Sequence, residues 1–157
     1  MRRLRFQNGP LDATDAAILR ALSRDARVTM ADLARAVGLS PPSVTERVRR
    51  LEEAEVIQGY AAVIDPAALG LTLAAYIRIR PMPGQLRKVA EVLLRLEAII
   101  ECDRVTGEDC FVAKAYVRSV AEEALIDEIN PYAMTNTSVI QSSPVKRRMP
   151  PLPNSMA

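Results

Sequence analysis

The segment from Ser40 to Arg50 carries hydroxyl, carboxylate and guanidinium side chains at a spacing suited to contacting DNA. Ser40 can cap a helix, and the proline after it is tolerated in a first helical turn, so a helix is expected to begin here. At about 100° per residue, Val44, Val48 and Leu51 share one narrow face. The other faces of the helix are available to contact a groove of DNA. The residues that we predict to bind DNA are Ser40, Pro42, Ser43, Thr45, Glu46, Arg47, Arg49 and Arg50.

These residues divide by the part of DNA that each could reach. N-terminal residues of such a helix meet base edges, which assigns to the groove Ser43, Thr45, Glu46 and Arg49. Arg50 is predicted to contact phosphate. Arg47, at the edge of the apolar face, either bridges helices or reaches backbone phosphate. The simpler alternative is that these charges form the solvated face of an ordinary amphipathic helix.

Two helices upstream would position this segment. Thr29 is a capping residue, and a helix from about Met30 to Val37 is predicted after it. Gly38 supplies the backbone freedom needed to leave that helix. A helix starting at Asp12 completes a three-helix unit, and the β-prone run Val56 to Ile64 predicts a small wing. The pattern therefore indicates a winged helix-turn-helix.

The 157 residues carry a net charge of only +2, but this charge is unevenly distributed. Residues 1–60 hold ten arginines and eight acids, residues 61–140 hold eight basic and eleven acidic residues, and the tail holds three basic residues. The middle of the chain therefore has no electrostatic reason to touch DNA. A single DNA-binding domain with so small an excess of positive charge would bind phosphate weakly. Pairing two such domains in a homodimer is therefore favoured.

The second half of the chain predicts a sheet with two helices. Residues from Leu73 to Arg80 alternate between apolar and exposed types, as in a strand with one buried face. The elements expected after it are a helix over 86–96, strands over 99–106 and 111–117, a helix over 120–129 and a short strand over 138–141. This βαββαβ order is ferredoxin-like and makes the whole chain α+β. It leaves one sheet face uncovered, so a second copy is expected to pair there.

A glycine turn joins the two middle strands. Its backbone amides and hydroxyls could hold a carboxylate, while its acidic groups could meet an ammonium, as an amino acid would require. The alternative is a plain hairpin turn, because these residues also make good turns. The predicted effector-binding residues of this loop are Thr106, Gly107, Glu108, Asp109 and Cys110.

Four stretches carry a resemblance to a known family: LDATDAAILRAL near the start, DLARAVGLSPPSVTERVRRLEEAEVIQGYAAVID after it, LG at 69–70 and VTGEDCF at 105–111. In this order and spacing, the chain resembles the Lrp/AsnC, or feast/famine, transcriptional regulators. The resemblance implies that the second domain senses ligand and drives assembly. It further implies that subunits pair through their sheets, that dimers build rings up to an octamer, and that amino acids bind between dimers.

Two departures from the family pattern bear on the effector. Cys110 stands where many members have Asp, and Asp109 is one residue earlier, so it would face the other side of a strand. The segment 131–137 replaces a Pro-Gly-Val segment of many members. Predicted for the other wall of the effector site are Met134, Thr135, Asn136 and Thr137, although a methionine at such a junction is more often core filler.

Catalysis has little support in the sequence. The chain has no histidine, no glycine-rich phosphate loop and no cysteine pair at metal-ligand spacing, so no cofactor or metal is expected. The remote enzyme hypothesis makes Cys110 a nucleophile with Glu108 or Asp109 as acid or base, but an inert thiol is favoured. No transmembrane segment or secretory signal is visible, which favours the cytoplasm, no membrane partner and reduced cysteines.

We therefore predict a sequence-specific regulator of double-stranded DNA whose assembly and DNA binding respond to a small effector, with an amino acid favoured. The alternative is an effector-independent, nucleoid-organising DNA-binding protein. The predicted parts are a DNA-binding domain with an N-terminal arm (1–64), a linker (65–70), an effector-binding and oligomerisation domain (71–143) and a tail (144–157), loosely ordered or packed on a neighbour.

Overall fold

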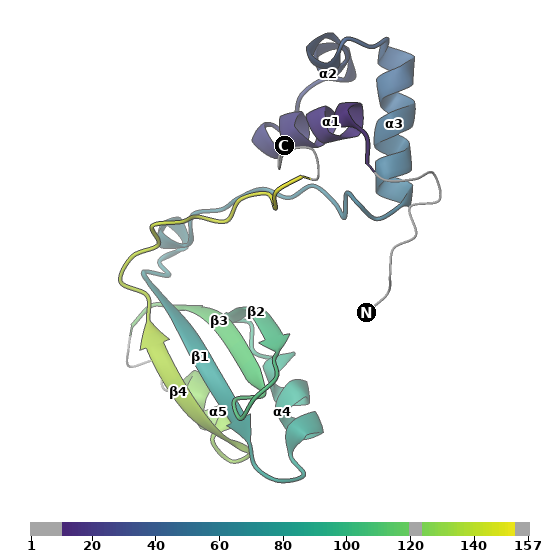
Figure 1. Ribbon diagram of the computed structural model, residues 1–157. Coiled ribbons are helices and arrows are strands. Elements are labelled where there is room, and N and C mark those ends of the chain that lie inside the picture. The colour runs from purple at the N-terminus through teal and green to yellow at the C-terminus, as the bar shows by residue number, and fades with distance from the viewer. Residues whose placement is uncertain (1–10, 120–123, 153–157) are drawn as a thin grey trace. The chain divides into compact units, whose positions relative to one another are not determined.

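The computed structural model describes residues 11–119 and 124–152, which divide into two compact units (Figure 1). One unit contains the described residues up to Ala62 together with those from Arg147 onward, and the other is Val63–Lys146. The C-terminal segment, predicted as a tail of its own, thus belongs in part to the first unit, where Leu152 is buried. Residues 1–10 and 153–157 of the predicted arm and tail lie outside the described residues.

The described part of the first unit contains three helices: α1 (Ala13–Arg24), α2 (Met30–Val37) and α3 (Pro41–Glu53). Their buried faces form one core, composed of Ile18, Leu22, Leu33, Ala34, Val44, Val48 and Leu51. The expected caps are confirmed: the side chains of Thr29 and Ser40 accept from backbone amides at the starts of α2 and α3. Gly38 ends α2 with φ of 70°, a left-handed conformation that glycine adopts readily.

The run Val56–Ile64, predicted to form the small wing, is irregular in this chain rather than a strand. Val56 and Ile57 pack against the helical core, whereas Val63 and Ile64 are exposed. A strand requires a partner for its backbone groups. The described part of the first unit contains no other strand, so β propensity alone leaves this run irregular.

The second unit is a four-stranded antiparallel sheet with both helices on one side (Figure 1). A short 3-10 helix, η1 (Pro66–Leu69), precedes it within the predicted linker. The elements of the sheet unit are β1 (Leu73–Pro81), α4 (Leu86–Leu93), β2 (Ile99–Arg104), β3 (Phe111–Val117), α5 (Ala124–Ile129) and β4 (Ala133–Val139). The strand order β2-β3-β1-β4 confirms the ferredoxin-like βαββαβ prediction.

Strand β1 shows how the sheet has two different faces. Ala75, Ile77 and Ile79 point into the core formed with α4 and α5. The residues that alternate with them, Tyr76, Arg78 and Arg80, are exposed on the opposite face, as the alternation predicted. We call that side the open face of the sheet.

The last strand begins earlier than predicted, at Ala133 rather than Ser138. It pairs with β1, placing Asn136 opposite Arg78 and Met134 opposite Arg80. This edge strand accommodates polar residues because one of its faces is open to solvent. Residues 120–123 of the predicted helix over 120–129 lie outside the described residues.

Candidate DNA-reading helix and effector pocket

The start of α3 is organised by hydroxyl groups. The hydroxyls of Ser40 and Ser43 lie 2.8 Å apart, and the amide of Ser43 donates to Ser40 Oγ at 3.4 Å. The hydroxyl of Thr45 donates to the carbonyl of Pro41 at 2.9 Å. These residues and Pro42 are exposed, so the first turns of α3 present a polar surface while Val44 is buried beneath it.

Arg49 lies between two glutamates on the exposed side of α3. Its Nε and Nη2 donate to the two carboxylate oxygens of Glu46 at 2.9 and 2.6 Å, and its Nη1 donates to Glu53. The three side chains remain 53, 53 and 60% exposed. The Arg49 hydrogen bond lowers the pKa of Glu46, and the same contact raises the pKa of Arg49. Both groups are therefore ionised at neutral pH.

Arg47 turns away from this surface toward α1. Its Nη1 lies 2.8 Å from Asp12 Oδ2 and 2.7 Å from Asp15 Oδ1. The two aspartates also cap α1 reciprocally, because each backbone amide donates to the other side chain. The Asp15 amide, and then Arg47, lower the pKa of Asp12. This geometry corresponds to the helix-bridging interpretation of Arg47. Arg50, the predicted phosphate contact, is half-buried.

A cavity of about 290 Å³ lies on the open face of the sheet. It combines the end of the glycine turn with β1 and β4, and its lining residues are Arg78, Arg80, Asp109, Met134, Thr135 and Asn136. Four of these were predicted from sequence. The two arginines were missed, although their alternation with buried isoleucines marked them as residues of the open face.

Hydrogen bonds and ion pairs connect the walls of this cavity. Arg80 Nη2 is 2.6 Å from Glu108 Oε2, and Arg80 Nε is 3.5 Å from Asp109 Oδ1. Arg78 Nη2 donates to Asn136 Oδ1 at 3.3 Å. The cavity therefore carries cationic, anionic and amide groups beside the exposed apolar side chain of Met134.

The other predicted effector residues lie elsewhere. Thr137 lines a separate cavity of about 70 Å³ on the helix side of the sheet, because strand alternation turns it away from Asn136. Cys110 packs against the core of the second unit. Thr106, Gly107 and Glu108 form the turn beside the cavity of about 290 Å³ without lining it. Gly107 has φ of 113°, which favours glycine.

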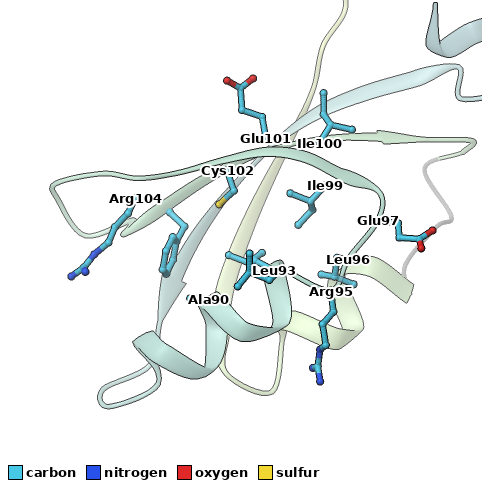
Figure 2. A pocket seen from close by; sticks show the side chains of 12 residues that line it. Ala90, Leu93, Arg95, Leu96, Glu97, Ile99, Ile100, Glu101, Cys102 and Arg104 are labelled. Atoms are coloured by element: carbon cyan, nitrogen blue, oxygen red, sulfur yellow. The ribbon is translucent and has the colours of Figure 1, made fainter. Parts of the chain in front are cut away.

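A third cavity, of about 490 Å³, lies between α4 and the edge strand β2 (Figure 2). In Figure 2, Cys102 and Ile99 point toward α4, whereas Ile100 and Glu101 point to the other side of the strand. Burial, and then Asp103, raise the pKa of the Cys102 thiol. The sequence did not indicate this cavity.

The described residues contain no group of three or more histidine, cysteine or acidic side chains that could hold a metal ion. Among the same residues, none of the helices has the length and apolar character needed to cross a membrane.

Comparison with known proteins agrees with this division into two parts. Residues 11–58 match the family model described as winged helix-turn-helix DNA-binding, and residues 74–150 match the Lrp/AsnC ligand binding domain. The HTH-type transcriptional regulator LrpC of Bacillus subtilis is 36% identical over 133 residues, which cover 84% of this chain and 92% of LrpC.

Solved structures extend the likeness to the tertiary fold. The structure of B. subtilis LrpC superposes with a TM-score of 0.84 at 34% identity, covering 88% of this chain and 100% of that chain. A feast or famine regulatory protein from Mycobacterium tuberculosis, complexed with L-methionine, superposes with a TM-score of 0.82 at 36% identity. The match covers 88% of this chain and 97% of that chain.

Proposed function

Because this chain belongs to the Lrp/AsnC family of DNA-binding transcriptional regulators, we propose that α3 reads DNA and that the cavity on the open face binds an amino acid. The observation that carries the effector proposal is the grouping of Arg78, Asp109 and Met134 around one cavity. Binding of the amino acid would then alter the oligomeric assembly and hence DNA binding. This coupling requires the amino acid to bind one oligomeric assembly more tightly than another.

The DNA contacts are assigned to the exposed side of α3. Ser43, Thr45, Glu46 and Arg49 are the groove residues, since threonine methyls, carboxylates and guanidinium groups each match a base edge. Ser40 and Pro42, at the start of α3, are assigned to DNA binding without a specific contact, and Arg50 is assigned to phosphate. Arg47 is assigned to holding α3 on α1, because both of its carboxylate partners belong to α1 or its cap.

The effector cavity has the groups that a zwitterion requires. The Arg78 guanidinium, beside the Asn136 amide, can bind a carboxylate, and the Asp109 carboxylate can accept from an ammonium. Met134 is 66% exposed and offers an adaptable apolar contact for the ligand side chain. The relative from M. tuberculosis complexed with L-methionine supports an amino acid with an apolar side chain.

Assembly is proposed to use the open face of the sheet. Tyr76 is 47% exposed there, and Lys114 lies over the ring of Tyr116 at 5.5 Å. Burying these aromatic surfaces against a second copy would remove apolar area from water. A homodimer supplies two reading helices, and an octamer of four dimers is the larger assembly that the family resemblance favours.

A panel of amino acids tests the effector proposal directly. We expect the matching amino acid to raise the melting temperature and change the oligomeric mass, because a ligand at 100 times its Kd stabilises the native state by about 2.7 kcal/mol. Arg78→Ala should lose this response, whereas Arg87→Ala, an exposed arginine on α4, should retain it. A response that survives Arg78→Ala would move the effector to another site.

Binding-site selection from random duplex DNA tests the reading helix. Arg49→Ala should lose sequence-specific binding while keeping the fold and the amino-acid response, and Arg78→Ala should show the opposite losses. Unchanged affinity of Arg49→Ala for the selected sequence would contradict the assignment of Arg49 to the groove.

A further inference from the structure

The reading helix α3 has an unusual charge balance for an element that meets a polyanion. Pro41–Glu53 contains three arginines and three glutamates, so its side chains carry no net charge. Sequence-independent DNA binding depends on cations that displace counterions from phosphates. A helix with balanced charges contributes little to this sequence-independent binding, so its acidic residues require an explanation.

Two of the three glutamates contact Arg49. Glu46 engages it through both carboxylate oxygens at 2.9 and 2.6 Å, and Glu53 approaches from one turn further along. All three side chains are more than half exposed, so the cluster faces solvent rather than the core. In the free protein, each of the three guanidinium nitrogens of Arg49 therefore already donates to a carboxylate of the same helix.

We propose that Glu46 and Glu53 hold Arg49 in the free protein and yield it only to a matching base pair, which suppresses binding to non-specific DNA. This inference rests on the proposed role of α3 as the reading helix. It makes Glu46 a specificity-determining residue.

Base chemistry explains why a matching base pair can release Arg49 when a phosphate cannot. Guanine offers two acceptors to a bidentate arginine, and the amino group of cytosine donates to a carboxylate. Three residues of helix rise about 4.5 Å, comparable to the ~3.4 Å between successive base pairs. Arg49 and Glu46 could therefore be satisfied together within a G·C-containing step. A phosphate offers Glu46 no donor and repels it, so Arg49 gains one anionic partner there only by losing another.

The test compares non-specific and specific binding of the full chain at several salt concentrations. Sites are first selected from a random duplex library, and affinities are then measured for the selected site and for random-sequence DNA. Glu46→Gln should bind random DNA about two- to fivefold more tightly near physiological salt, the range expected for exposed charges. Its plot of log K against log salt should steepen by up to about 0.9, because Arg49 loses one of its two carboxylate partners and a phosphate can take the place of that partner.

Glu97→Gln is the charge-matched control. It makes the same change in net charge at an exposed position of the second unit, so it should change neither the affinity for random DNA nor the salt slope. The ratio of specific to non-specific affinity should fall for Glu46→Gln alone.

Arg49→Ala separates release of the arginine from simple removal of a negative charge. In the Arg49→Ala chain, Glu46→Gln should leave the salt slope unchanged. Two results would overturn this inference without contradicting the proposed role of α3. One is the same steepening of the salt slope in the Arg49→Ala chain. The other is unchanged non-specific binding of Glu46→Gln while the wild type still selects a sequence. A wild type that enriches no sequence would overturn both this inference and the proposed role of α3.

Discussion

Arg47 connects α3, the proposed DNA-reading helix, to α1, and its removal should show how strongly this contact holds the first unit together. The guanidinium lies 2.7 Å from Asp15 and 2.8 Å from Asp12, and the side chain of Asp15 is only 11% exposed. Arg47→Ala would therefore leave an almost buried carboxylate without its cation. Such groups are costly because the interior solvates a lone charge poorly.

The magnitude follows from the exposure of the partners. Breaking a fully buried ion pair by removing one partner costs about 3–5 kcal/mol, whereas exposed pairs contribute about 0–1 kcal/mol. Arg47 is 29% exposed and Asp12 is 50% exposed, so we expect Arg47→Ala to lower the free energy of unfolding of the first unit by about 1–3 kcal/mol. The matched control is Arg35→Ala, whose pair with Asp32 is 79 and 48% exposed and should cost less than about 1 kcal/mol.

Urea unfolding of the full chain provides the assay, with hydrogen exchange of α1 and α3 amides to assign the transition to the first unit. Asp15→Asn in the Arg47→Ala chain should recover part of the loss, because the amide leaves no unpaired charge. Equal stability of Arg47→Ala and Arg35→Ala would refute the reasoning. So would a lower salt slope of DNA binding at unchanged stability, which would make Arg47 a phosphate contact.

Three further predictions concern local features. Gly38→Ala should destabilise the first unit by about 1–2 kcal/mol, because φ of 70° is unfavourable for a residue with a Cβ, and Gly38→Asn should cost less in the same unfolding assay. Partial burial and Glu52 raise the pKa of Tyr60 to about 12. The folded state then holds the Tyr60 proton more tightly than the unfolded state does. The contribution of Tyr60 to the free energy of unfolding is therefore full below pH ~10 and is lost as the pH rises toward 12, and Tyr60→Phe should reduce this decline in stability. Cys102 should alkylate more slowly at neutral pH than a thiol with the ordinary cysteine pKa, since its raised pKa leaves less thiolate; a normal rate at its peptide, read by mass spectrometry, would contradict this.

The two sites differ in how much of each could be predicted from sequence. In the reading helix, Ser40, Gly38 and the apolar spacing act within a few residues, so the start of α3 and its exposed side followed from local rules. The partners of Arg47 could not be predicted in this way, because Asp12 and Asp15 lie more than thirty positions earlier and either a phosphate or a carboxylate would satisfy the same guanidinium.

In the proposed effector cavity, less of the site could be predicted from local rules. Asp109 and Asn136 could be predicted from the glycine turn and the last segment, but Arg78 and Arg80 could not be assigned to the same site. Their place depends on the register that puts Asn136 opposite Arg78 and Met134 opposite Arg80. The same pairing extended β4 to Ala133 and turned Thr137 to the helix side, against the prediction.

The sequence by itself determined the order of the elements, the caps and turns of the helical unit and the buried phase of β1, because propensity, capping and periodicity act between neighbouring residues. Only the tertiary structure decided which strands pair, that the run Val56–Ile64 is irregular, and which charges meet across elements. The physical reason is that backbone pairing and ion pairing are satisfied by any suitable group within reach, and only the folded chain determines which group that is.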